Sequence, residues 1–491
     1  MKQNPTIKKT IILLILILAL SLVFNQCASA QKQDKAETAS DSKPEIKNVI
    51  VFIGDGAGSQ QRRLAALVEG NGDPEHRLHM EKMTTSGLAF NHSLDKLVTD
   101  SAASGTALAT GFKTKNYCIS MLPDGTKLKT ILEMCKERGM GTGLVTTVPM
   151  AHATPAAFGA HVKSRKMMDE IADQFLKTEI DVLMGGGRED FLPTRETIKP
   201  HPEVSKVDSL THATYEIETW TGKRKDGRNL IREFQKKGYF FAPDARVLRQ
   251  LVPGDTRKII ALFCKGAMAY EIDRPVNRQP SIAEMTEKSI QVLRKNPNGF
   301  FLMVEGGKID WANHGHDVAG SVYDTIALDK AVKIALDFQK KHPDTLVLVV
   351  NDHETGGMAI TANINIPRIK KLEASADRMA NLINRDGSNV DEVFKQYAGI
   401  TDLKPRERQM VIDEATGKLN VADEWGYGGT VIANILDIYT GVHFSTGGHS
   451  GTPVVVAVQG PGSCEFDGFY DQTEIPRKIA RLLGFEMPEK K

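Results

Sequence analysis

Short, almost continuous apolar runs alternate with helix-length segments along most of this chain. The apolar runs have the length of strands and lie at residues 48–53, 142–147, 181–184, 299–304, 345–350 and 453–458. Between them are segments with the length and apolar spacing of helices, at residues 127–138, 167–177, 282–295 and 322–339. Strands that are apolar throughout are typical of a parallel sheet covered by helices. The alternation therefore predicts an α/β fold with a central, largely parallel sheet and helices on both faces.

Two long stretches, residues 194–256 and 363–442, depart from this alternation. Both are highly charged and only locally periodic, with helical patterns at residues 368–385 and 390–397. We expect them to be insertions on the sheet scaffold that form a cap or a subunit contact. The predicted catalytic domain, with these insertions, spans residues 48–491.

The first 30 residues have the pattern of a secretory signal peptide. Lysines precede an apolar run at residues 11–24, and Ala28-Ser29-Ala30 forms a cleavage site of small residues. The run is too short and wrongly flanked for a membrane span. We expect cleavage after Ala30; a lipid anchor on Cys27 is the alternative. The sequence predicts an exported protein, periplasmic or extracellular, in which residues 31–47 form a flexible, polar tether without a membrane span.

The net charge and the cysteine spacing indicate neither a nucleic-acid partner nor a cysteine metal site. The formal net charge of the 491 residues is +2, so no broad basic surface indicates a nucleic-acid partner. The four cysteines after the signal are widely spaced and form no C-x-x-C pattern; they are Cys118, Cys135, Cys264 and Cys464. The sequence assigns no disulfide pairing and no metal site to them.

The segment Leu97-Val-Thr-Asp-Ser-Ala-Ala103 contains a candidate nucleophile, Ser101. Small residues follow it to residue 110, so Ser101 is expected near a helix N-terminus, where backbone N–H groups favour anions such as phosphate. Ser and Asp are also ordinary helix caps. A catalytic role for Ser101 therefore requires metals or bases from elsewhere in the chain.

Carboxylates and imidazoles beside the predicted strands could supply those metals, because open α/β sheets build their sites at strand ends. Asp310 and His314 are four residues apart and would share one helix face, whereas His316 falls on another face. Gathered carboxylates repel one another unless cations neutralise them. The mixed nitrogen and oxygen donors suit zinc, and an all-oxygen set suits magnesium. The candidate ligands are Asp55, Glu305, Asp310, His314, Asp352, His353 and His449.

Two further residues could complete a phosphate site. The segment His152-Ala-Thr-Pro-Ala-Ala157 contributes a hydroxyl at Thr154, and Arg165 follows shortly after it. A guanidinium group beside metal ions would form a planar fork for two phosphoryl oxygens.

Six ordered segments resemble the motifs of the alkaline phosphatases. They are I-G-D-G, T-D-S-A-A-S, A-T-P-A-A with a downstream S-R-K, V-E-G-G-K-I-D-W-A-N-H, N-D-H-E-T-G-G and G-G-H-S-G. The resemblance extends from about residue 48 to about residue 458 and omits the tether and the two insertions. It implies a metal-dependent phosphomonoesterase, exported according to the N-terminal signal pattern, that forms a phosphoserine at Ser101 and, by family analogy, a homodimer.

The resemblance also implies two zinc ions and one magnesium ion. One zinc would be bound by Asp310, His314 and His449. The second zinc would be bound by Asp55, Asp352, His353 and the oxygen of Ser101. The magnesium would be bound by Asp55, Thr154 and Glu305. Arg165 would then bind the phosphate, and Asp100 would position Arg165 from outside the metal sites.

At His152 and Trp311 the chain departs from the best-known bacterial pattern of this family, which has an aspartate and a lysine there. An imidazole and an indole do not reproduce that carboxylate and ammonium, although other members resemble this chain in using His or an aromatic residue. These two differences affect the binding of the third metal and the affinity for released phosphate.

Two other functions remain as alternatives. A phosphodiesterase of the same superfamily would share most of these residues, although Arg165 favours the doubly charged monoester. A non-catalytic exported metal- or phosphate-binding protein would not need both Ser101 and a complete ligand set. A sulfatase is disfavoured because the segment after Ser101 lacks the Pro and Arg of C/S-x-P-x-R, and the glycine clusters near Asp55 and residue 186 match no complete nucleotide-binding motif.

Overall fold

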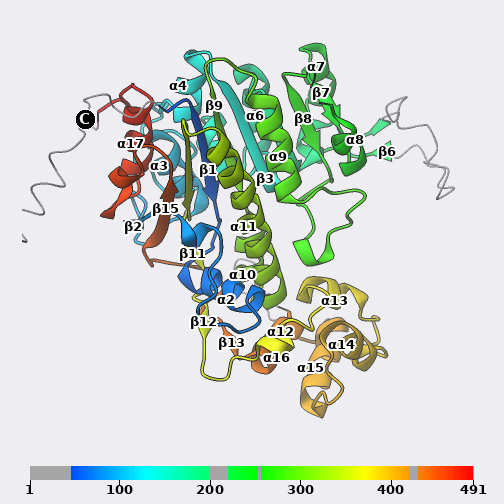
Figure 1. Cartoon of the computed structure of the whole chain (residues 1–491). Coiled ribbons are helices and arrows are strands. Elements are labelled where there is room, and N and C mark those ends of the chain that lie inside the picture. The colour runs from blue at the N-terminus through cyan, green and yellow to red at the C-terminus, as the bar shows by residue number, and fades with distance from the viewer. Residues whose placement is uncertain (1–45, 198–218, 253, 255, 420–429, 490–491) are drawn as a thin grey trace, which may run out of the picture. The chain divides into compact units, whose positions relative to one another are not determined.

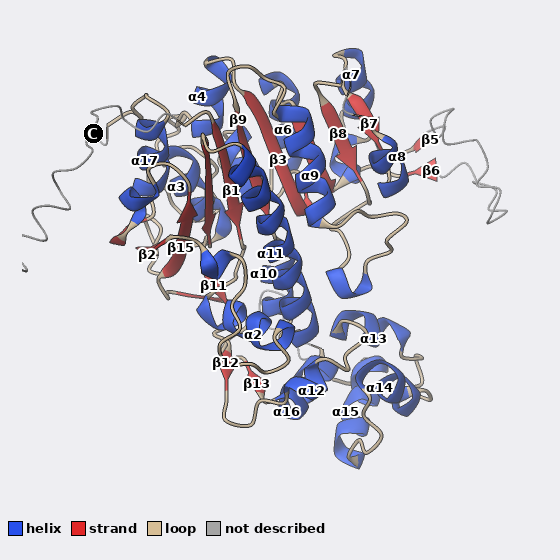
Figure 2. Cartoon of the chain, viewed as in Figure 1, coloured by secondary structure: helices blue, strands red, loops and turns tan. Residues whose placement is uncertain are grey.

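The computed structural model describes residues 46–197, 219–252, 254, 256–419 and 430–489. Its main element is a ten-stranded sheet with the order β16-β2-β15-β10-β1-β9-β3-β4-β8-β7 (Figures 1 and 2). Seven neighbouring strands are parallel: β10 (Thr345–Val350), β1 (Asn48–Ile53), β9 (Phe300–Glu305), β3 (Gly141–Pro149), β4 (Val182–Gly186), β8 (Ile259–Leu262) and β7 (Phe240–Ala242). The predicted α/β class with a largely parallel sheet is confirmed.

The other edge of the sheet contains the antiparallel pairings. Strand β15 (Val454–Gln459) runs antiparallel to both β10 and β2 (Thr85–Phe90), and β16 (Gly468–Asp471) runs parallel to β2 at the edge. The apolar runs in the sequence predicted β15 but neither β2 nor β16. Every second residue of β2 is exposed or half-buried, so this strand lacks a continuous apolar run.

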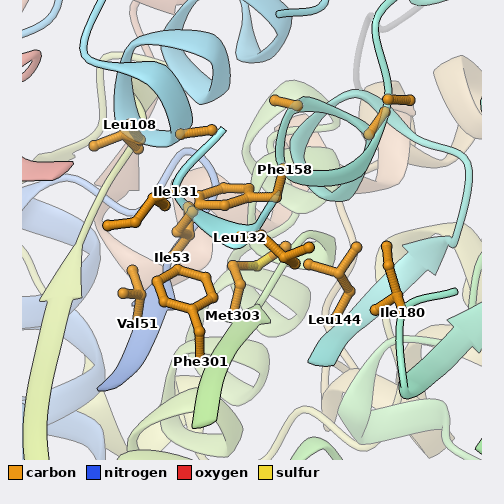
Figure 3. Close-up of a cluster of buried hydrophobic side chains, with 14 of the residues drawn as sticks. Val51, Ile53, Leu108, Ile131, Leu132, Leu144, Phe158, Ile180, Phe301 and Met303 are labelled. Atoms are coloured by element: carbon orange, nitrogen blue, oxygen red, sulfur yellow. The ribbon is translucent and has the colours of Figure 1, made fainter. Parts of the chain in front are cut away.

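Strand side chains alternate between two apolar layers, one on each face of the sheet. In Figure 3, Val51 of β1 and Phe301 of β9 lie on the same face as Ile131 of α4. Ile50 and Phe52 point to the opposite layer. The first layer is covered by α3 (Ser101–Thr110), α4 (Ile131–Glu137), α5 (Ala153–Gly159), α6 (Met168–Thr178), α7 (Leu230–Lys236) and α17 (Glu474–Leu482). The second is covered by α2 (Ser59–Glu69), α8 (Ala245–Gln250), α9 (Ile282–Leu293) and α11 (Val318–Lys341).

The second predicted insertion forms a group of helices with its own apolar core. They are α12 (Ile366–Ile369), α13 (Ala376–Leu382), α14 (Val390–Ala398), α15 (Pro405–Ala415) and α16 (Val431–Thr440). The helix expected at residues 368–385 is wrong as one element, because Ser375 caps the start of α13 by accepting a hydrogen bond from the Arg378 N–H. Residues 420–429 of the predicted insertion lie outside the described part.

The first predicted insertion is only partly separate from the sheet. It contains β5 (Glu196–Thr197), β6 (Thr219–Trp220), α7, β7 and α8, and β7 is hydrogen-bonded to β8 in the central sheet. The later part of this stretch therefore continues the α/β scaffold. A role as cap or subunit contact stays a prediction.

The signal peptide and tether predicted for residues 1–47 fall almost wholly outside the described residues. In the part of the chain that the structure describes, no helix combines the length and apolar character needed to cross a membrane. Cys118, Cys135, Cys264 and Cys464 are all free thiols.

Candidate active site

Ser101 is the first residue of α3, as its sequence context predicted. Asp100 is the N-cap, and its Oδ1 accepts a hydrogen bond from the Ala103 N–H at 3.0 Å. The small residues of α3 allow the helix to pack closely on α5. Ser101 is buried, and its Oγ lies 3.2 Å from Nε2 of His353. The hydroxyl therefore faces a histidine from the end of β10, far away in the sequence.

Asp310, His314 and His449 meet in one cluster. The first two lie on α10 (Lys308–His314), and His449 lies in β14 (His449–Ser450), which pairs with β11 (Glu354–Thr355). Nε2 of His314 is 3.4 Å from Oδ1 of Asp310 and 3.1 Å from Nε2 of His449. The predicted helical spacing of Asp310 and His314 thus places both side chains at the same point.

Hydrogen bonds on the far side of each ring fix which nitrogen carries the proton. Nδ1 of His314 lies 2.5 Å from the Gly447 carbonyl, and Nδ1 of His449 lies 2.8 Å from the Thr99 carbonyl. A carbonyl only accepts, so each Nδ1 must donate, and in the neutral form of each ring Nε2 presents its lone pair to the cluster. Two lone pairs and the Asp310 carboxylate oxygen converge without a proton between them, which is the arrangement of a metal site.

Asp55, Asp352 and His353 form a second cluster at the ends of β1 and β10. Nε2 of His353 is 3.6 Å from Oδ1 of Asp55 and 3.1 Å from Oδ2 of Asp352. The Thr355 hydroxyl donates to Asp310 at 2.5 Å and so accepts from Nδ1 of His353 at 3.2 Å. This leaves the Nε2 lone pair of His353 directed at the two carboxylates and at Ser101.

A third group surrounds Asp55 on its other side. One ligand atom each of Asp55, Glu305 and His152 lies within 4.8 Å of the other two. Within the described residues, no hydrogen-bond partner reaches either oxygen of Asp55, Oε1 of Glu305 or the Thr154 hydroxyl, although all four atoms are buried. Buried polar atoms without partners are costly, so these oxygens fit the coordination of a cation.

The electrostatics of the clusters show the same need for positive charge. Burial and then the charges of Asp352 and Asp310 raise the pKa of Asp55 well above its usual value. Burial raises the pKa of Asp352 to about 8 and that of Glu305 to about 7. Burial raises the pKa of Asp310, but positive charge placed on the surrounding histidines outweighs burial and holds this pKa well below normal. Divalent cations would let all these carboxylates stay ionised.

Arg165 lies at the edge of these clusters and is held by two partners. Its Nη1 donates to Oδ2 of Asp100 at 3.1 Å, which confirms the predicted contact between these residues. Its Nη2 donates to Nε2 of His152 at 3.0 Å, because a guanidinium cannot accept. The His152 ring meets the ring of Trp311 edge-on, with centroids 6.1 Å apart. The guanidinium is thus fixed before any phosphate binds.

His152 therefore differs from the three ligand-type histidines. Burial, then the nearby Arg165 charge, lowers its pKa to about 3, so the ring is neutral. Because Nε2 accepts from Arg165, the proton is on Nδ1, which has no hydrogen-bond partner among the described residues. His152 was not among the predicted ligands, but the resemblance had placed it beside the third metal, and the structure brings it close to Asp55 and Glu305.

The structure brings together all the candidate residues that the sequence singled out, except His316. The ring of His316 stacks on Phe444, and its Nε2 lies 3.1 Å from the Thr446 carbonyl. Thr355 and the carbonyls of Thr99 and Gly447, which set the histidine protons, were not predicted. All three residues lie inside motifs that the sequence singled out, but the motifs do not show that Thr355 and the two backbone carbonyls contact the histidine rings.

Comparisons with known proteins agree with this geometry. A model of the alkaline phosphatase family matches residues 46–485. Alkaline phosphatase 3 of Bacillus subtilis (strain 168) is 34% identical over 501 aligned positions, covering 99% of this chain and 99% of that protein.

Solved structures show the same relationship. The crystal structure of Thermus thermophilus alkaline phosphatase has a TM-score of 0.77 at 27% identity and covers 92% of this chain and 96% of its own. A histidine-to-aspartate mutant of TAB5 alkaline phosphatase, with Mg bound in its M3 site, has a TM-score of 0.63 at 27% identity. The match covers 91% of this chain and 100% of the TAB5 chain. The chain described here therefore belongs to the alkaline phosphatase family of phosphate-monoester hydrolases.

Proposed function

We propose that this chain is an exported, metal-dependent phosphatase that hydrolyses phosphate monoesters through a phosphoserine at Ser101. The observation that carries the proposal is the position of the Ser101 hydroxyl, 3.2 Å from Nε2 of His353. This nitrogen belongs to a ligand cluster with two buried carboxylates. A serine at a helix N-terminus beside such a cluster is suited to attack phosphorus.

The donor atoms fit two zinc ions and one magnesium ion. The two clusters that contain histidine lone pairs suit zinc, and the oxygens of Asp55, Thr154 and Glu305 suit magnesium. When bound, such cations would lower the pKa of the Ser101 hydroxyl and of water and would neutralise charge on the leaving oxygen. His152 lies beside the magnesium position but holds its proton on Nδ1, so we assign the third ion to oxygen ligands.

The protein groups have defined roles in the reaction. Ser101 Oγ attacks phosphorus in line, the bond from phosphorus to the ester oxygen breaks, and the alcohol leaves. Water then attacks the phosphoserine from the opposite side, which breaks the bond to Oγ and releases inorganic phosphate. Arg165, held by Asp100 and His152, donates to two phosphoryl oxygens in both steps.

Replacing the nucleophile tests the proposal. In the Ser101→Ala variant, release of p-nitrophenol from p-nitrophenyl phosphate by the zinc- and magnesium-loaded protein should fall at least about 10³-fold. Ser388→Ala, at an exposed position just before α14, is a control that keeps the nucleophile and should retain activity within about tenfold. Unchanged turnover in Ser101→Ala would rule out the phosphoserine mechanism.

A phosphodiesterase and a non-catalytic binding protein are the alternatives. Arg165 presents two donors, which match a terminal phosphoryl group better than a diester. Comparing p-nitrophenyl phosphate with its bis ester should show a clear preference for the monoester. A stronger rate on the diester would overturn the assignment, and zinc-loaded protein without any turnover would favour a binding role.

Export is proposed from the N-terminal sequence, whose residues lie outside the described part. The apolar run and Ala28-Ser29-Ala30 predict a mature protein that begins at Gln31. Sequencing the N-terminus of the exported protein tests this directly. A lipid-modified Cys27 at that terminus would instead show a membrane-anchored form.

We also propose, by analogy with the family, that the chain forms a homodimer. Exposed apolar side chains on β2, on β16 and in the loop before Ser101 support it, namely Leu88, Phe90, Leu94, Leu97, Val98 and Phe469. The rings of Phe90 and Phe469 are in edge contact, with centroids 5.1 Å apart. Contiguous exposed apolar side chains are typical of an interaction site. Light scattering of the wild type and of Phe469→Glu should show a dimer and a monomer, respectively.

A further inference from the structure

The ammonium group of Lys308 is packed against two aromatic rings next to the active site. Its Nζ lies 3.7 Å from the ring centroid of Tyr270 and 4.6 Å from that of Trp311. Lys308 and Tyr270 are each only 6% exposed. A cation over the face of an aromatic ring is attracted most strongly when it is desolvated. Lys308 therefore stabilises one orientation of the Trp311 indole.

The surroundings of Lys308 hold the ammonium in that place. Its backbone N–H donates to the Thr147 hydroxyl at 3.0 Å, which fixes the start of α10. Burial lowers the pKa of Lys308, and the carboxyl groups of Asp324 on α11, Asp377 on α13 and Asp317 at the cap of α11 oppose this shift and favour the ammonium form. A side chain that is held at both its backbone and its charged end has little freedom to move.

Contacts continue from Trp311 to the phosphate-binding arginine. The Trp311 ring meets His152 at an interplanar angle of 70°, and His152 accepts the hydrogen bond from Arg165. Trp311 and His152 are both half-buried. Each ring is therefore held partly by the side chains that contact it, Lys308 on one side and Arg165 on the other. A rotation of the indole would remove the packing that orients the imidazole, and the imidazole holds one of the two guanidinium nitrogens.

We propose that Lys308 is a positioning residue for phosphate binding, acting through Trp311 and His152 on Arg165. The inference rests on the proposed function, in which Arg165 binds the phosphoryl group. Lys308 does not touch substrate. Its role is to keep the Trp311 indole against His152, so that Arg165 is oriented before the substrate arrives.

The first test compares Lys308→Met with Lys308→Arg. Met removes the charge, whereas Arg keeps a cation that can stack on both rings. In Lys308→Met, KM for p-nitrophenyl phosphate and Ki for inorganic phosphate should both rise about 3- to 10-fold, while kcat changes less than about twofold. Lys308→Arg should restore both constants to within about twofold. The exposed Lys330 of α11 provides a matched control, since Lys330→Met should change neither.

The second test asks whether the effect passes through the indole. Trp311→Leu should itself raise Ki for inorganic phosphate, and Lys308→Met added to it should raise Ki less than about twofold further. The chain has three tryptophans. Replacing Trp220 and Trp425 by Phe makes Trp311 the sole source of tryptophan fluorescence. In that background, Lys308→Met should shift the emission of Trp311 and Lys308→Arg should not.

These outcomes separate the inference from the proposed function. An inactive wild type would overturn the function. An active wild type in which Lys308→Met keeps the wild-type Ki, or lowers kcat alone, would overturn the inference. A full Lys308→Met effect in the Trp311→Leu background would also overturn it. If Lys308→Met does not fold, the Trp311→Leu and Lys308→Arg arms still decide: the inference fails if Trp311→Leu leaves Ki unchanged or if Lys308→Arg weakens phosphate binding as much as Trp311→Leu does.

Discussion

Two groups of buried carboxylates differ sharply in what surrounds them. In the active site, Asp55, Asp352 and Asp310 lie with histidine nitrogens in clusters whose ligand atoms are within 4.8 Å of one another. The second group, Asp317, Asp324 and Asp437, lies on α11 and its cap and on α16, which packs against α11. Among the described residues, the second group belongs to no such cluster.

The second group is satisfied mainly by the backbone. Oδ2 of Asp317 accepts from the Ala376 N–H at 2.7 Å, and Oδ2 of Asp324 accepts from the Glu271 N–H at 2.9 Å. Oδ1 of Asp437 has no hydrogen-bond partner within the described ranges. Burial raises the pKa of Asp317 to about 7, and that of Asp324 and of Asp437 to about 8.

The comparison teaches that a raised carboxyl pKa does not by itself identify a metal site. Burial raises the pKa in both groups. What distinguishes the active site is that the lone pairs of three histidines, fixed by Gly447, Thr99 and Thr355, point at the carboxylates. Convergent lone pairs require a cation, whereas a single buried carboxyl group can simply be protonated.

Removing the metal ions should have the largest effect, because only the active-site group of carboxylates is expected to depend on them. After dialysis against a chelator, turnover of p-nitrophenyl phosphate should fall at least about 10³-fold, and zinc with magnesium should restore it. The melting temperature should fall with it, because bound metal stabilises only the folded state. Metal analysis before and after dialysis is the measurement. Full activity in metal-free protein would contradict the assignment of the clusters.

Replacing one carboxyl group in each of the two groups should sharpen the comparison. Asp352→Asn removes a ligand charge and should lower both the zinc content and kcat, the latter about 100-fold or more. Asp437→Asn makes the same chemical change at a buried carboxyl outside the clusters and should leave both within about twofold of the wild type. Equal losses in the two variants would mean that general destabilisation, rather than metal binding, explains the first.

Asp100→Asn should have a smaller effect, on phosphate binding. An amide oxygen can still cap α3 at the Ala103 N–H, but the ion pair with Arg165 is lost and an amide N–H group faces the guanidinium. We expect Ki for inorganic phosphate to rise about 5- to 20-fold with unchanged zinc content. An unchanged Ki would show that His152 alone holds Arg165.

Much of this comparison was predictable from sequence, because strand ends determine where side chains meet. β1 and β10 are almost continuously apolar, so Asp55 and Asp352, which follow them, could be placed at one edge of the sheet. Asp310 and His314 followed from helical spacing. β2 was missed because it alternates in burial at the antiparallel side of the sheet.

Other parts of the site depend on contacts that leave no pattern in the sequence. The carbonyls of Thr99 and Gly447 fix the histidine protons whatever side chains those residues have. The contact of His152 with Arg165 depends on side-chain packing between the start of α5 and a separate loop. The raised pKa of Asp437 arises from tertiary burial. Periodicity and motif spacing report local geometry, so they carry no information on such contacts.

Asp437→Asn should have the smallest effect, on the pH dependence of stability. The folded pKa of Asp437, about 8, is far above that of an unfolded aspartate, so the folded state binds the extra proton between about pH 4 and pH 8. The free energy of unfolding therefore falls as the pH rises through this range.

The amide introduced by Asp437→Asn cannot ionise, so this variant should match the metal-loaded wild type near pH 5 and exceed its free energy of unfolding by about 1–3 kcal/mol at pH 9. Urea denaturation at both pH values measures this. Asp386→Asn is the control, because Asp386 is exposed and hydrogen bonds to Ser388 lower its pKa, so that this variant should gain nothing at pH 9. A gain of the same size at pH 5 would contradict the prediction, because the protonated wild type carries no charge at Asp437 there and the gain could not come from preventing its ionisation.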